Sequence, residues 1–499
     1  MSNFFISRER AESDLLAAAA YIGERIKSSD GHAEAMNAVV PRYLANGEVD
    51  LAAELANSVN DPYSRDRLLT LIAEKCAAID DDEYALQLAD AIEDRGLRVQ
   101  AFERIGMVKA AKGEISKAED IAVGMEHPDF VYSGIAVFQE SDGDEASAAD
   151  TLDRIEFASA RVAAMLHIAA ANIQKDEYQQ AVKWLEKAVV SAHEIEHVEE
   201  KIRALCDVGN QFIEAKQNDK AVETFAAARE IAELLDNVHR DPFLATCALG
   251  FLHSGSADMG DSTLDLVTDK TSMASALLGF ARDAWTKDAK DDAVETLEES
   301  YAILRSQREA ETRDSRARNA LLASIATQFA GFGKTERGVE IAFENPDPDE
   351  RTGALTQIVR ILTIQNEDEL ARQTLDEIGD DAGRLFAFIG MADVKRSQDK
   401  GGESVAFLDE AALMADSIPQ LASRSGVLNE IAARFAEQGQ TEKARAIIGQ
   451  NMSLISEILD NSSQAALLAS IVDILDDSGM QISESDREHL RHLVRKTDT

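Results

Sequence analysis

The sequence is poor in the residues that build tight turns, disulfide frameworks and aromatic cores. Its 499 residues include 7 prolines, 27 glycines and 3 cysteines, and aromatic residues make up 5%. So few turn-forming residues disfavour an all-β protein, and three cysteines are too few for a disulfide framework. Hydrophobic residues still reach 45%, which is enough for a large core. With few aromatics, that core must be aliphatic and rich in alanine.

Positive charge is also scarce. Lys and Arg number 51 against 92 Asp and Glu, which gives a formal net charge of −41. A field of this sign repels phosphate backbones and anionic membrane surfaces, so it disfavours nucleic-acid binding, including RNA binding by helical repeats. The same field attracts cations. We therefore expect a protein or peptide partner with basic character.

Long apolar segments are missing too. No run of about 18 apolar residues occurs, and the N-terminal stretch lacks the apolar core of a secretory signal. We therefore expect no membrane insertion. Cys76, Cys206 and Cys247 fall within helical patterns, where a free cysteine behaves as a small buried apolar residue. Free thiols fit a reducing compartment, so the sequence predicts a cytoplasmic protein.

One pattern recurs along the chain and predicts its architecture. In its clearest copies a large apolar residue, which we call the anchor, is followed at once by Ala or Gly. Gly, Asp or Asn often stands eight residues after the anchor, and Ala thirteen residues after it. Thirteen anchors follow one another at intervals of 30 to 45 residues, most often 33. They are Val39, Ile72, Ile105, Ile135, Ile168, Val208, Leu249, Phe280, Ile325, Ile358, Ile389, Ile431 and Ile471.

This spacing predicts pairs of antiparallel helices. Two helices of about 13 residues with two short turns occupy about 33 residues. Gly or Asn between the anchor and the Ala suits the left-handed end of a first helix, as at Gly113 and Gly439. The Ala must be small because the two helices cross closely there. One pair cannot bury its apolar face alone, so pairs stack into a solenoid.

Two copies of the pattern carry a family resemblance. The first has Val208, Gly209, Phe212, Ala221, Phe225 and Ala228, and the second has Ile431, Ala432, Phe435 and Ala444. In these offsets the chain resembles the tetratricopeptide repeat, a helix-turn-helix unit of about 34 residues. The resemblance covers about residues 33–480 and implies an all-α fold, a right-handed superhelical α-solenoid of about 13 helix-turn-helix units. A HEAT-like array, with a period of about 40–47 residues, is the nearest rival.

The pattern also predicts a division of the chain into five parts. We expect an N-terminal capping helix in 1–32, the first part of the array in 33–305, a charged extension or hinge in 306–316, the second part of the array in 317–480, and a C-terminal polar cap and tail in 481–499.

One segment, from His193 to His197, has a literal catalytic spacing, with the sequence HEIEH. On a single helix, His at i and i+4 share a Zn²⁺ and the intervening Glu acts as a general base, so a metal-dependent hydrolase is one alternative. Against it, Glu196 adds charge where zinc-binding helices prefer none, and Arg203 stands where a third ligand would be. We interpret the segment as an exposed helix end, and expect no metal, no cofactor and no catalysis.

A second segment, Gly331 to Thr335 (GFGKT), is similar to the end of a phosphate-binding loop. Gln328 stands where that loop needs Gly, and the preceding residues have a helical pattern instead of a strand. We interpret it as a turn between helices. His489 and His492, near the basic C-terminal residues, are expected to complement a helix dipole and not to bind metal.

For function, the resemblance implies partner binding on a concave face lined by the first helices. The residues that line it stand five before, two before, two after and five after each anchor. From the central units this gives the partner-binding candidates Arg203, Asn210, Phe251, Arg282 and Trp285. Phe251 and the other large apolar residues of this face fit a repeat-to-repeat core equally well.

The function expected from these observations is a protein–protein interaction scaffold, an adaptor or an assembly factor. It would bind a partner protein or peptide on the concave surface without catalysis. A structural subunit of a larger complex is the other interpretation that the sequence leaves open.

Overall fold

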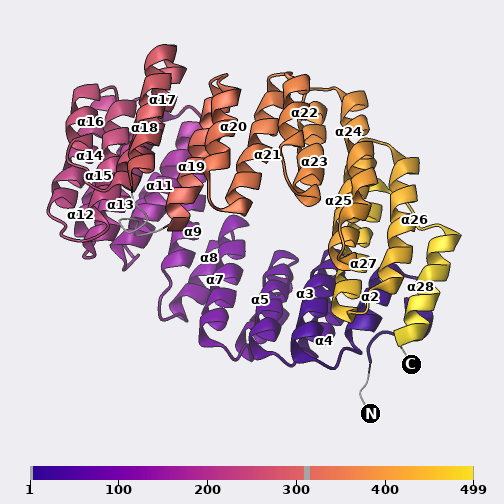
Figure 1. The fold of residues 1–499 in the computed structure, drawn as a ribbon. Helices are drawn as coiled ribbons and strands as arrows, with labels where there is room; N and C mark the ends of the chain where they lie inside the picture. Colours follow the sequence, from indigo (N-terminus) through magenta and orange to yellow (C-terminus); the bar gives the residue numbers. More distant parts are fainter. Residues whose placement is uncertain (1–3, 308–314, 498–499) are drawn as a thin grey trace. The chain divides into compact units, whose positions relative to one another are not determined.

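The computed structural model describes residues 4–307 and 315–497, and within them it holds 28 α-helices, one short 3₁₀ helix and no strand (Figure 1). The all-α prediction is therefore confirmed. α1 (Arg8–Ala11) and α2 (Leu15–Gly23) precede thirteen consecutive pairs of helices. The first helices of the pairs are α3 (Ser29–Ala45), α5 (Pro62–Ala78), α7 (Arg95–Ala111), α9 (Asp129–Ser141), α11 (Ala158–Gln174), α13 (Val198–Glu214), α15 (Arg240–His253), α17 (Lys270–Thr286), α19 (Ser315–Gly331), α21 (Pro348–Ile364), α23 (Asp381–Ser397), α25 (Leu421–Glu437) and α27 (Asn461–Ser478). The second helices are α4 (Val49–Asn57), α6 (Asp82–Ala91), α8 (Ile115–Val123), α10 (Glu145–Leu152), α12 (Tyr178–Glu194), α14 (Asn218–Glu233), α16 (Ala257–Leu264), α18 (Lys290–Ser306), α20 (Thr335–Glu344), α22 (Asp368–Asp376), α24 (Gly401–Met414), which the 3₁₀ helix η2 (Ala415–Ser417) follows, α26 (Thr441–Glu457) and α28 (Glu484–Thr497).

Each predicted anchor lies in the first helix of a different pair, from Val39 in α3 to Ile471 in α27. The helix-turn-helix units of the predicted α-solenoid, thirteen in the described residues, are thus confirmed. The structure supports a helical-repeat fold in general, whereas the tetratricopeptide resemblance rests on the sequence pattern.

In every pair, the turn that connects the two helices contains a single residue in the left-handed conformation. Positive φ occurs at thirteen described residues, and each one lies in the turn within a different pair. Seven of them are glycines, which adopt this conformation without steric cost. In eleven pairs the left-handed residue stands eight positions after the predicted anchor. The turn chemistry therefore marks the repeat register.

The same turns show that two predicted anchors are wrong by two residues. Gly255, the left-handed residue after α15, follows Leu249 by only six positions. Counting back eight positions gives Cys247, which is fully buried, whereas Leu249 is partly exposed. In α23, the left-handed residue Asp399 follows Ile389 by ten positions, and counting back eight positions gives Met391 as the anchor, although both residues are buried. A helix in a solenoid offers several apolar positions, so apolarity alone does not set the register.

The two helices of a pair approach so closely that the position thirteen after the anchor must be small. A Cβ atom at Gly338 would lie 2.5 Å from the carbonyl oxygen of Ala326, and one at Gly260 would lie 3.0 Å from that of Ala248. Ser404 uses the same proximity, because its hydroxyl donates a 2.7 Å hydrogen bond to the corresponding carbonyl of α23. These contacts confirm the prediction that the residue thirteen after the anchor is small because the two helices cross closely there.

Close packing also joins successive pairs around Phe225 on α14. A Cβ atom at Gly209 of α13 would lie 2.8 Å from its ring, and one at Gly250 of α15 would lie 2.4 Å from it. Phe251 packs edge-on against the same ring, with centroids 6.1 Å apart. The ring is therefore held from three sides.

Contacts divide the chain into two compact units. Unit 1 comprises Met1–Val108 with Thr363–Thr499, and unit 2 comprises Lys109–Leu362. The predicted division into five parts is not tested by these contacts and stays a prediction. Most of its charged extension, 306–316, lies outside the described residues.

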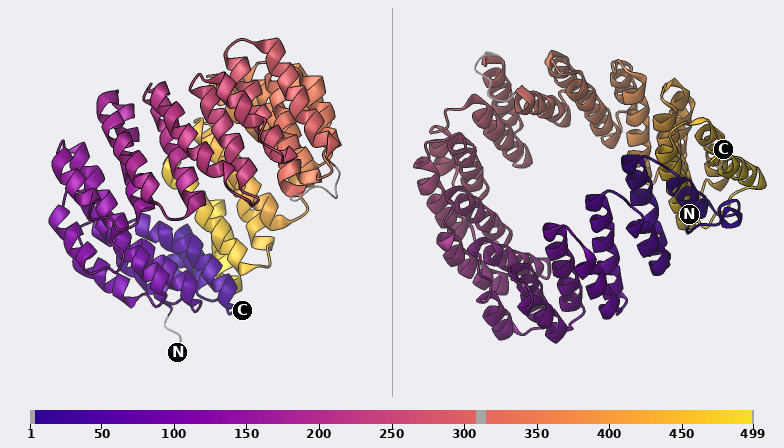
Figure 2. Two further views of the ribbon diagram at one scale, coloured as in Figure 1. Left: turned by 90° about the vertical axis from the view of Figure 1, so that its left-hand side faces the viewer. Right: turned by 90° about the horizontal axis from the view of Figure 1, so that it is seen from below.

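Unit 1 brings together helices from the two ends of the chain. α27 packs against α2 and α3, and α28 contacts α1 and α2. These indigo and yellow helices lie side by side in both views of Figure 2. Arg42 donates hydrogen bonds of 2.8 and 2.5 Å to Asp473, and Ser462 donates one of 2.7 Å to Glu34. The last pair of helices is therefore packed against the first residues of the chain.

Three first helices carry near their N-terminal ends a buried aspartate that connects the pair to the one that follows. Asp66, Asp129 and Asp241 each stand six residues before the anchor of their pair, counting Cys247 as the anchor of α15. Each carboxylate accepts hydrogen bonds of 2.5–3.1 Å from two consecutive backbone N–H groups, 27 and 28 residues further on. These N–H groups lie in the loop before the next first helix, so the carboxylate satisfies donors that the loop would otherwise leave unpaired.

Replacement of Gly250 by Ala tests the packing around Phe225. The added methyl group has no room because the ring is held from three sides, so we expect the free energy of unfolding to fall by about 1–3 kcal/mol. Gly353→Ala is the matched control on the exposed face of α21, where a Cβ meets nothing within 4 Å. That change should raise stability by about 0.5–1 kcal/mol. Urea unfolding measures both, and equal effects of the two variants would contradict the packing argument.

Asp241 predicts an acid-sensitive contribution to stability. Burial alone would raise its pKa, but hydrogen bonds from Thr268 and the Asp269 N–H, with the charge of Arg240, lower the pKa below its ordinary value of 3.8. A lowered folded-state pKa stabilises the fold above about pH 4, and this contribution is lost as pH falls through the lower value. Asp241→Asn should therefore lose about 1–2 kcal/mol at pH 7 and show a flatter stability profile below pH 4.

The exposed residue Asp236 supplies the control for this pH dependence. Asp236→Asn should keep the wild-type profile between about pH 2 and 5 in thermal unfolding. An Asp241→Asn profile parallel to that of the wild type would show that the carboxylate does not contribute.

Candidate protein-binding surface

In unit 2 the first helices form one continuous face. From α9 to α19, each first helix packs against the next first helix. Successive second helices do not approach one another to the same extent in the described part of this unit. A stack whose first helices lie closer together than its second helices curves toward the first helices. The first-helix face is therefore the concave side of unit 2.

Four of the five predicted partner-binding residues reach this face. Arg203 and Asn210 on α13 and Arg282 on α17 are exposed, and Trp285 on α17 is partly exposed. Phe251, by contrast, is fully buried. The structure brings Arg203 and Asn210 onto one helix face, two turns apart, and places Arg282 and Trp285 together on another.

Arg282 and Trp285 already bridge two successive pairs. The Arg282 Nε donates a 2.6 Å hydrogen bond to the Gln328 Oε1 on α19. The Trp285 ring stacks on Phe332, with centroids 4.2 Å apart and planes inclined by 13°. These contacts hold both side chains in place on the face, so a ligand would meet a preformed surface.

The prediction that Phe251 contacts a partner is wrong, and the register of α15 explains why. Counted from Cys247, Phe251 stands four residues after the anchor, as Phe212 does in α13. Both rings are buried core positions. The position on α15 that corresponds to Asn210 is Leu249, which is partly exposed. The alternative interpretation of Phe251 as core is confirmed.

The HEIEH segment does not lie on one helix. α12 ends at Glu194, Ile195 is extended with φ −61° and ψ 125°, and His197 is the N-cap of α13. His193 and His197 thus belong to different helices, and both are exposed. In the part of the chain that the structure describes, no group of three or more His, Cys, Asp and Glu is placed to hold a metal ion. The single-helix zinc geometry of the hydrolase alternative is therefore contradicted.

The GFGKT segment is an inter-helix turn, as expected. α19 ends at Gly331, Gly333 is left-handed with φ 70°, and α20 begins at Thr335. The preceding element is a helix, so the strand that a phosphate-binding loop requires does not precede it.

The three cysteines are buried and free, as the sequence predicts. The Sγ atoms of Cys206 and Cys247 lie 3.9 Å apart on α13 and α15. The hydrogen bond with Cys247 and burial raise the pKa of Cys206, which keeps it in the unreactive thiol form.

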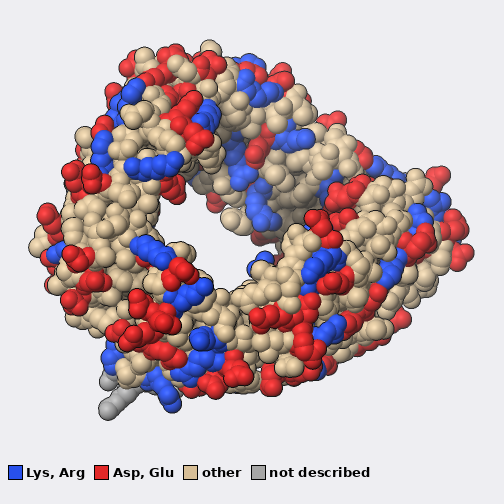
Figure 3. Space-filling model, turned by 90° about the horizontal axis from the view of Figure 1, so that it is seen from above, with Lys and Arg blue, Asp and Glu red and all other residues tan. Residues whose placement is uncertain are grey.

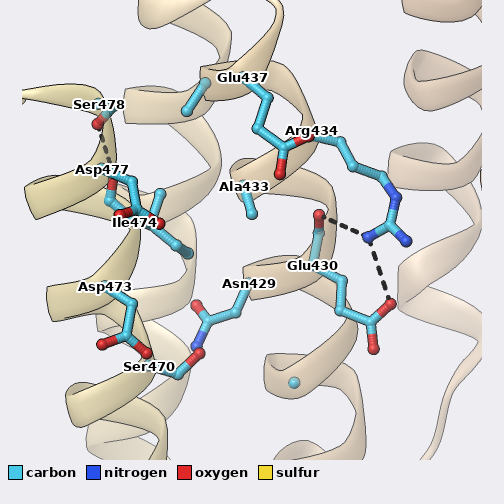
Figure 4. A pocket seen from close by; sticks show the side chains of 12 residues that line it. Asn429, Glu430, Ala433, Arg434, Glu437, Ser470, Asp473, Ile474, Asp477 and Ser478 are labelled. Atoms are coloured by element: carbon cyan, nitrogen blue, oxygen red, sulfur yellow. Dashed lines mark hydrogen bonds and ion pairs between the residues drawn. The ribbon is translucent and has the colours of Figure 1, made fainter. Parts of the chain in front are cut away.

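Sequence reasoning missed the cleft between α25 and α27 in unit 1 (Figure 4), which has a volume of about 420 Å³. Small residues make room for it, with Gly426, Ala433 and Ala436 on α25 and Ser470 and Ser478 on α27. Three of these five come from the same offsets that predicted the face of unit 2, counted from the anchor Ile431. The signal was available, but the candidates were taken from the central units, where larger side chains occur.

Four carboxylates and one guanidinium line the same cleft. Glu430, Arg434 and Glu437 come from α25, and Asp473 and Asp477 come from α27 (Figure 4). Their i, i+4 and i, i+3 spacings place the residues of each helix on one face. The lining therefore carries more negative than positive side chains, above a floor of small apolar ones.

The single guanidinium of the cleft is already neutralised. Arg434 lies 3.5 Å from Glu430, and its Nε donates hydrogen bonds of 3.0 and 3.2 Å to the two carboxylate oxygens of Asp393 on α23. Because Asp393 takes most of this charge, Glu430 is only partly compensated.

Two other carboxylates of the cleft have partners outside it. Glu437 pairs with Arg396, and Asp473 pairs with Arg42. Among the described residues, no ion pair involves Asp477. Asp477 and Glu430 are therefore the carboxylates best placed to meet a cation from a partner.

Negative charge is not confined to this cleft. Asp and Glu side chains are spread over the face shown in Figure 3, with Lys and Arg among them. With 92 acidic and 51 basic residues in the chain, most of the surface field is negative.

No family model and no curated protein sequence matches the chain. Solved structures with a distant likeness include Ton1535 from Thermococcus onnurineus NA1, with a TM-score of 0.25 and 14% identity over 70% of this chain and 97% of that one. Aspartyl phosphate phosphatase F from Bacillus subtilis has a TM-score of 0.28 and 14% identity over 71% of this chain and 94% of that one. The structure of Naa15/Naa10 bound to HypK-THB has a TM-score of 0.27 and 12% identity over 87% of this chain and 78% of that one. At these scores the likeness says nothing about what this chain binds.

Among the described residues, no helix is both long enough and apolar enough to cross a membrane.

Zinc titration tests the split of the HEIEH segment between two helices. Because His193 and His197 do not share a helix face, His193→Ala should leave zinc binding unchanged within about twofold, as should the control His167→Ala on α11. Isothermal titration calorimetry measures both. One zinc ion per chain that is lost only in His193→Ala would restore the metal-site interpretation.

Proposed function

We propose that this protein is a non-enzymatic scaffold that binds a basic segment of a partner protein on its first-helix surfaces. The observation that carries the proposal is the cleft between α25 and α27. Its lining has four carboxylates, and its one guanidinium is held by Asp393 outside it. The net charge of −41 adds long-range attraction for cations. The free buried thiols fit a cytoplasmic site of action.

The cleft suits a lysine or arginine side chain of the partner. The methylene stem of such a side chain packs on small apolar surface, here that of Ala433 and Ile474, while its charged head stays near carboxylates. Glu430 and Asp477 are proposed as the charges that it meets. The gain in affinity is modest for each exposed pair and falls with salt.

We further propose that the partner contacts the first-helix face of unit 2. The exposed residues Arg203, Asn210 and Arg282 and the partly exposed Trp285 are the proposed contacts. Tryptophan is among the residue types most often found at the energetic centre of an interface. The stacking of Trp285 on Phe332 fixes the orientation of its ring before a partner binds. The buried Phe251 is not among them.

Binding of a synthetic peptide tests the cleft. The probe is a fluorescein-labelled peptide of alternating Arg and Leu, with a counterpart in which citrulline replaces Arg. Fluorescence anisotropy should show binding of the Arg peptide that weakens at least fivefold between about 50 and 300 mM NaCl. Glu430→Gln/Asp477→Asn should weaken it about tenfold, since two charge pairs of about 0.7 kcal/mol each are removed.

The control removes the same charge from the second helix of the same pair. Glu442→Gln/Glu457→Gln on α26 should bind the Arg peptide within twofold of the wild type. Equal weakening by both double variants would show attraction by net charge alone and would overturn the cleft as the site. Equal binding of the citrulline peptide would overturn the basic character of the partner.

A further inference from the structure

A second cleft lies in unit 1, where helices from the two ends of the chain meet. This junction pocket has a volume of about 380 Å³ and is lined by the ends of α1 and α3, the start of α2, the end of α27 and the start of α28. The lining residues that matter here are Arg10, Asp14, Tyr43, Glu48, Asp476 and Arg487. Its volume is near the lower end of small-molecule sites, which span about 300–1,000 Å³. The pocket is separate from the cleft between α25 and α27, and the inference is independent of the proposed function.

One fully buried polar group in the lining has no hydrogen-bond partner among the described residues. The Tyr43 side chain is fully buried, and among the described residues nothing hydrogen-bonds its hydroxyl. The partly exposed Arg487 pairs through its Nη1 with Glu484 at 3.5 Å, and its Nε has no hydrogen-bond partner in the described part of the chain. Burial raises the pKa of Tyr43, so its hydroxyl is a neutral donor. A buried donor without a partner is unfavourable, so the Tyr43 hydroxyl, with the free Nε of Arg487 beside the same pocket, indicates a ligand that carries hydrogen-bond acceptors.

The charges around the pocket define the rest of the ligand. The Arg10 guanidinium is neutralised, because its Nη2 lies 2.8 Å from both carboxylate oxygens of Glu48. Asp14 caps α2 by accepting a hydrogen bond of 2.6 Å from the Ala17 N–H. Burial and neighbouring carboxylates, Asp14 among them, raise the pKa of Asp476, so a positive group is favoured there. The pocket thus offers donors for an anionic group and carboxylates for a cationic one.

We propose that the junction pocket binds a small zwitterion of the α-amino-acid class. Its carboxylate accepts hydrogen bonds from the Tyr43 hydroxyl and the Arg487 Nε, and its ammonium group lies beside Asp14 and Asp476. Because the lining comes from both ends of the chain, the ligand stabilises the packing of α27 against α2 and α3. Bound ligand therefore raises the unfolding temperature of the protein by mass action.

The probes are the free α-amino acids, from glycine upward, with acetate and methylammonium as the separated halves of glycine. Isothermal titration calorimetry and thermal unfolding of the full chain are the measurements. We expect at least one amino acid to bind at least tenfold more tightly than either half and to raise the unfolding temperature. No binding of any amino acid up to about 10 mM would overturn the proposal. Acetate binding as tightly as the best amino acid would reduce the site to an anion site and also overturn it.

Variants separate this binding from an effect on folding. Tyr43→Phe removes only the unpartnered hydroxyl, so the free protein should remain as stable as the wild type while affinity for the best amino acid falls at least tenfold. Arg487→Ala should weaken binding to the same extent. Arg491→Ala, which removes a neighbouring arginine of α28 that pairs with Glu484, is the matched control and should bind as the wild type does. Wild-type affinity in Tyr43→Phe would overturn the proposal.

Discussion

The close approach of the two helices in each pair is the constraint on which the rest of the structure depends. In twelve of the thirteen pairs, with the corrected anchors, the residue thirteen after the anchor is Ala, Gly or Ser. At Gly338 even a methyl group would clash with the facing carbonyl. Because the helices nearly touch, one left-handed residue suffices for the turn. Each pair then presents the same apolar faces to its neighbours, and the pairs stack.

The proposed binding surfaces lie on the side of each pair that this packing leaves uncovered. Each first helix packs against its second helix with one face and leaves the opposite face free. On that free face, the residues five before, two before, two after and five after the anchor contact solvent or the next first helix. In the central pairs these positions carry Arg203, Asn210 and Arg282, whereas around Ile431 they carry Gly426, Ala433 and Ala436. The same geometry thus gives a polar face in one place and a cleft in the other. The difference lies only in side-chain size and charge.

Much of the fold was predictable because its signals are local. The anchors, the small residues and the left-handed turns are all read within about 20 residues, and they gave the thirteen pairs. The register of α15 failed because Leu249 and Cys247 are both apolar, and only the turn at Gly255 distinguishes them. Because of that error, Phe251 was predicted on the surface, whereas it lies in the core. The junction pocket could not be predicted, since Tyr43 and Arg487 are 444 positions apart and only tertiary packing joins them.

The packing of α27 on α2 and α3 has a consequence for how the chain folds. Helix pairs of a solenoid normally assemble with their sequence neighbours, so contacts are short-range and formation is fast. Here the Arg42–Asp473 contact joins residues 431 positions apart. Closing so long a loop has a large entropic cost. That cost falls once the intervening pairs have formed, because they reduce the flexible length between the two residues. We therefore expect the final step of folding to be a long-range closure, and the same contact made between two chains would produce a swapped dimer.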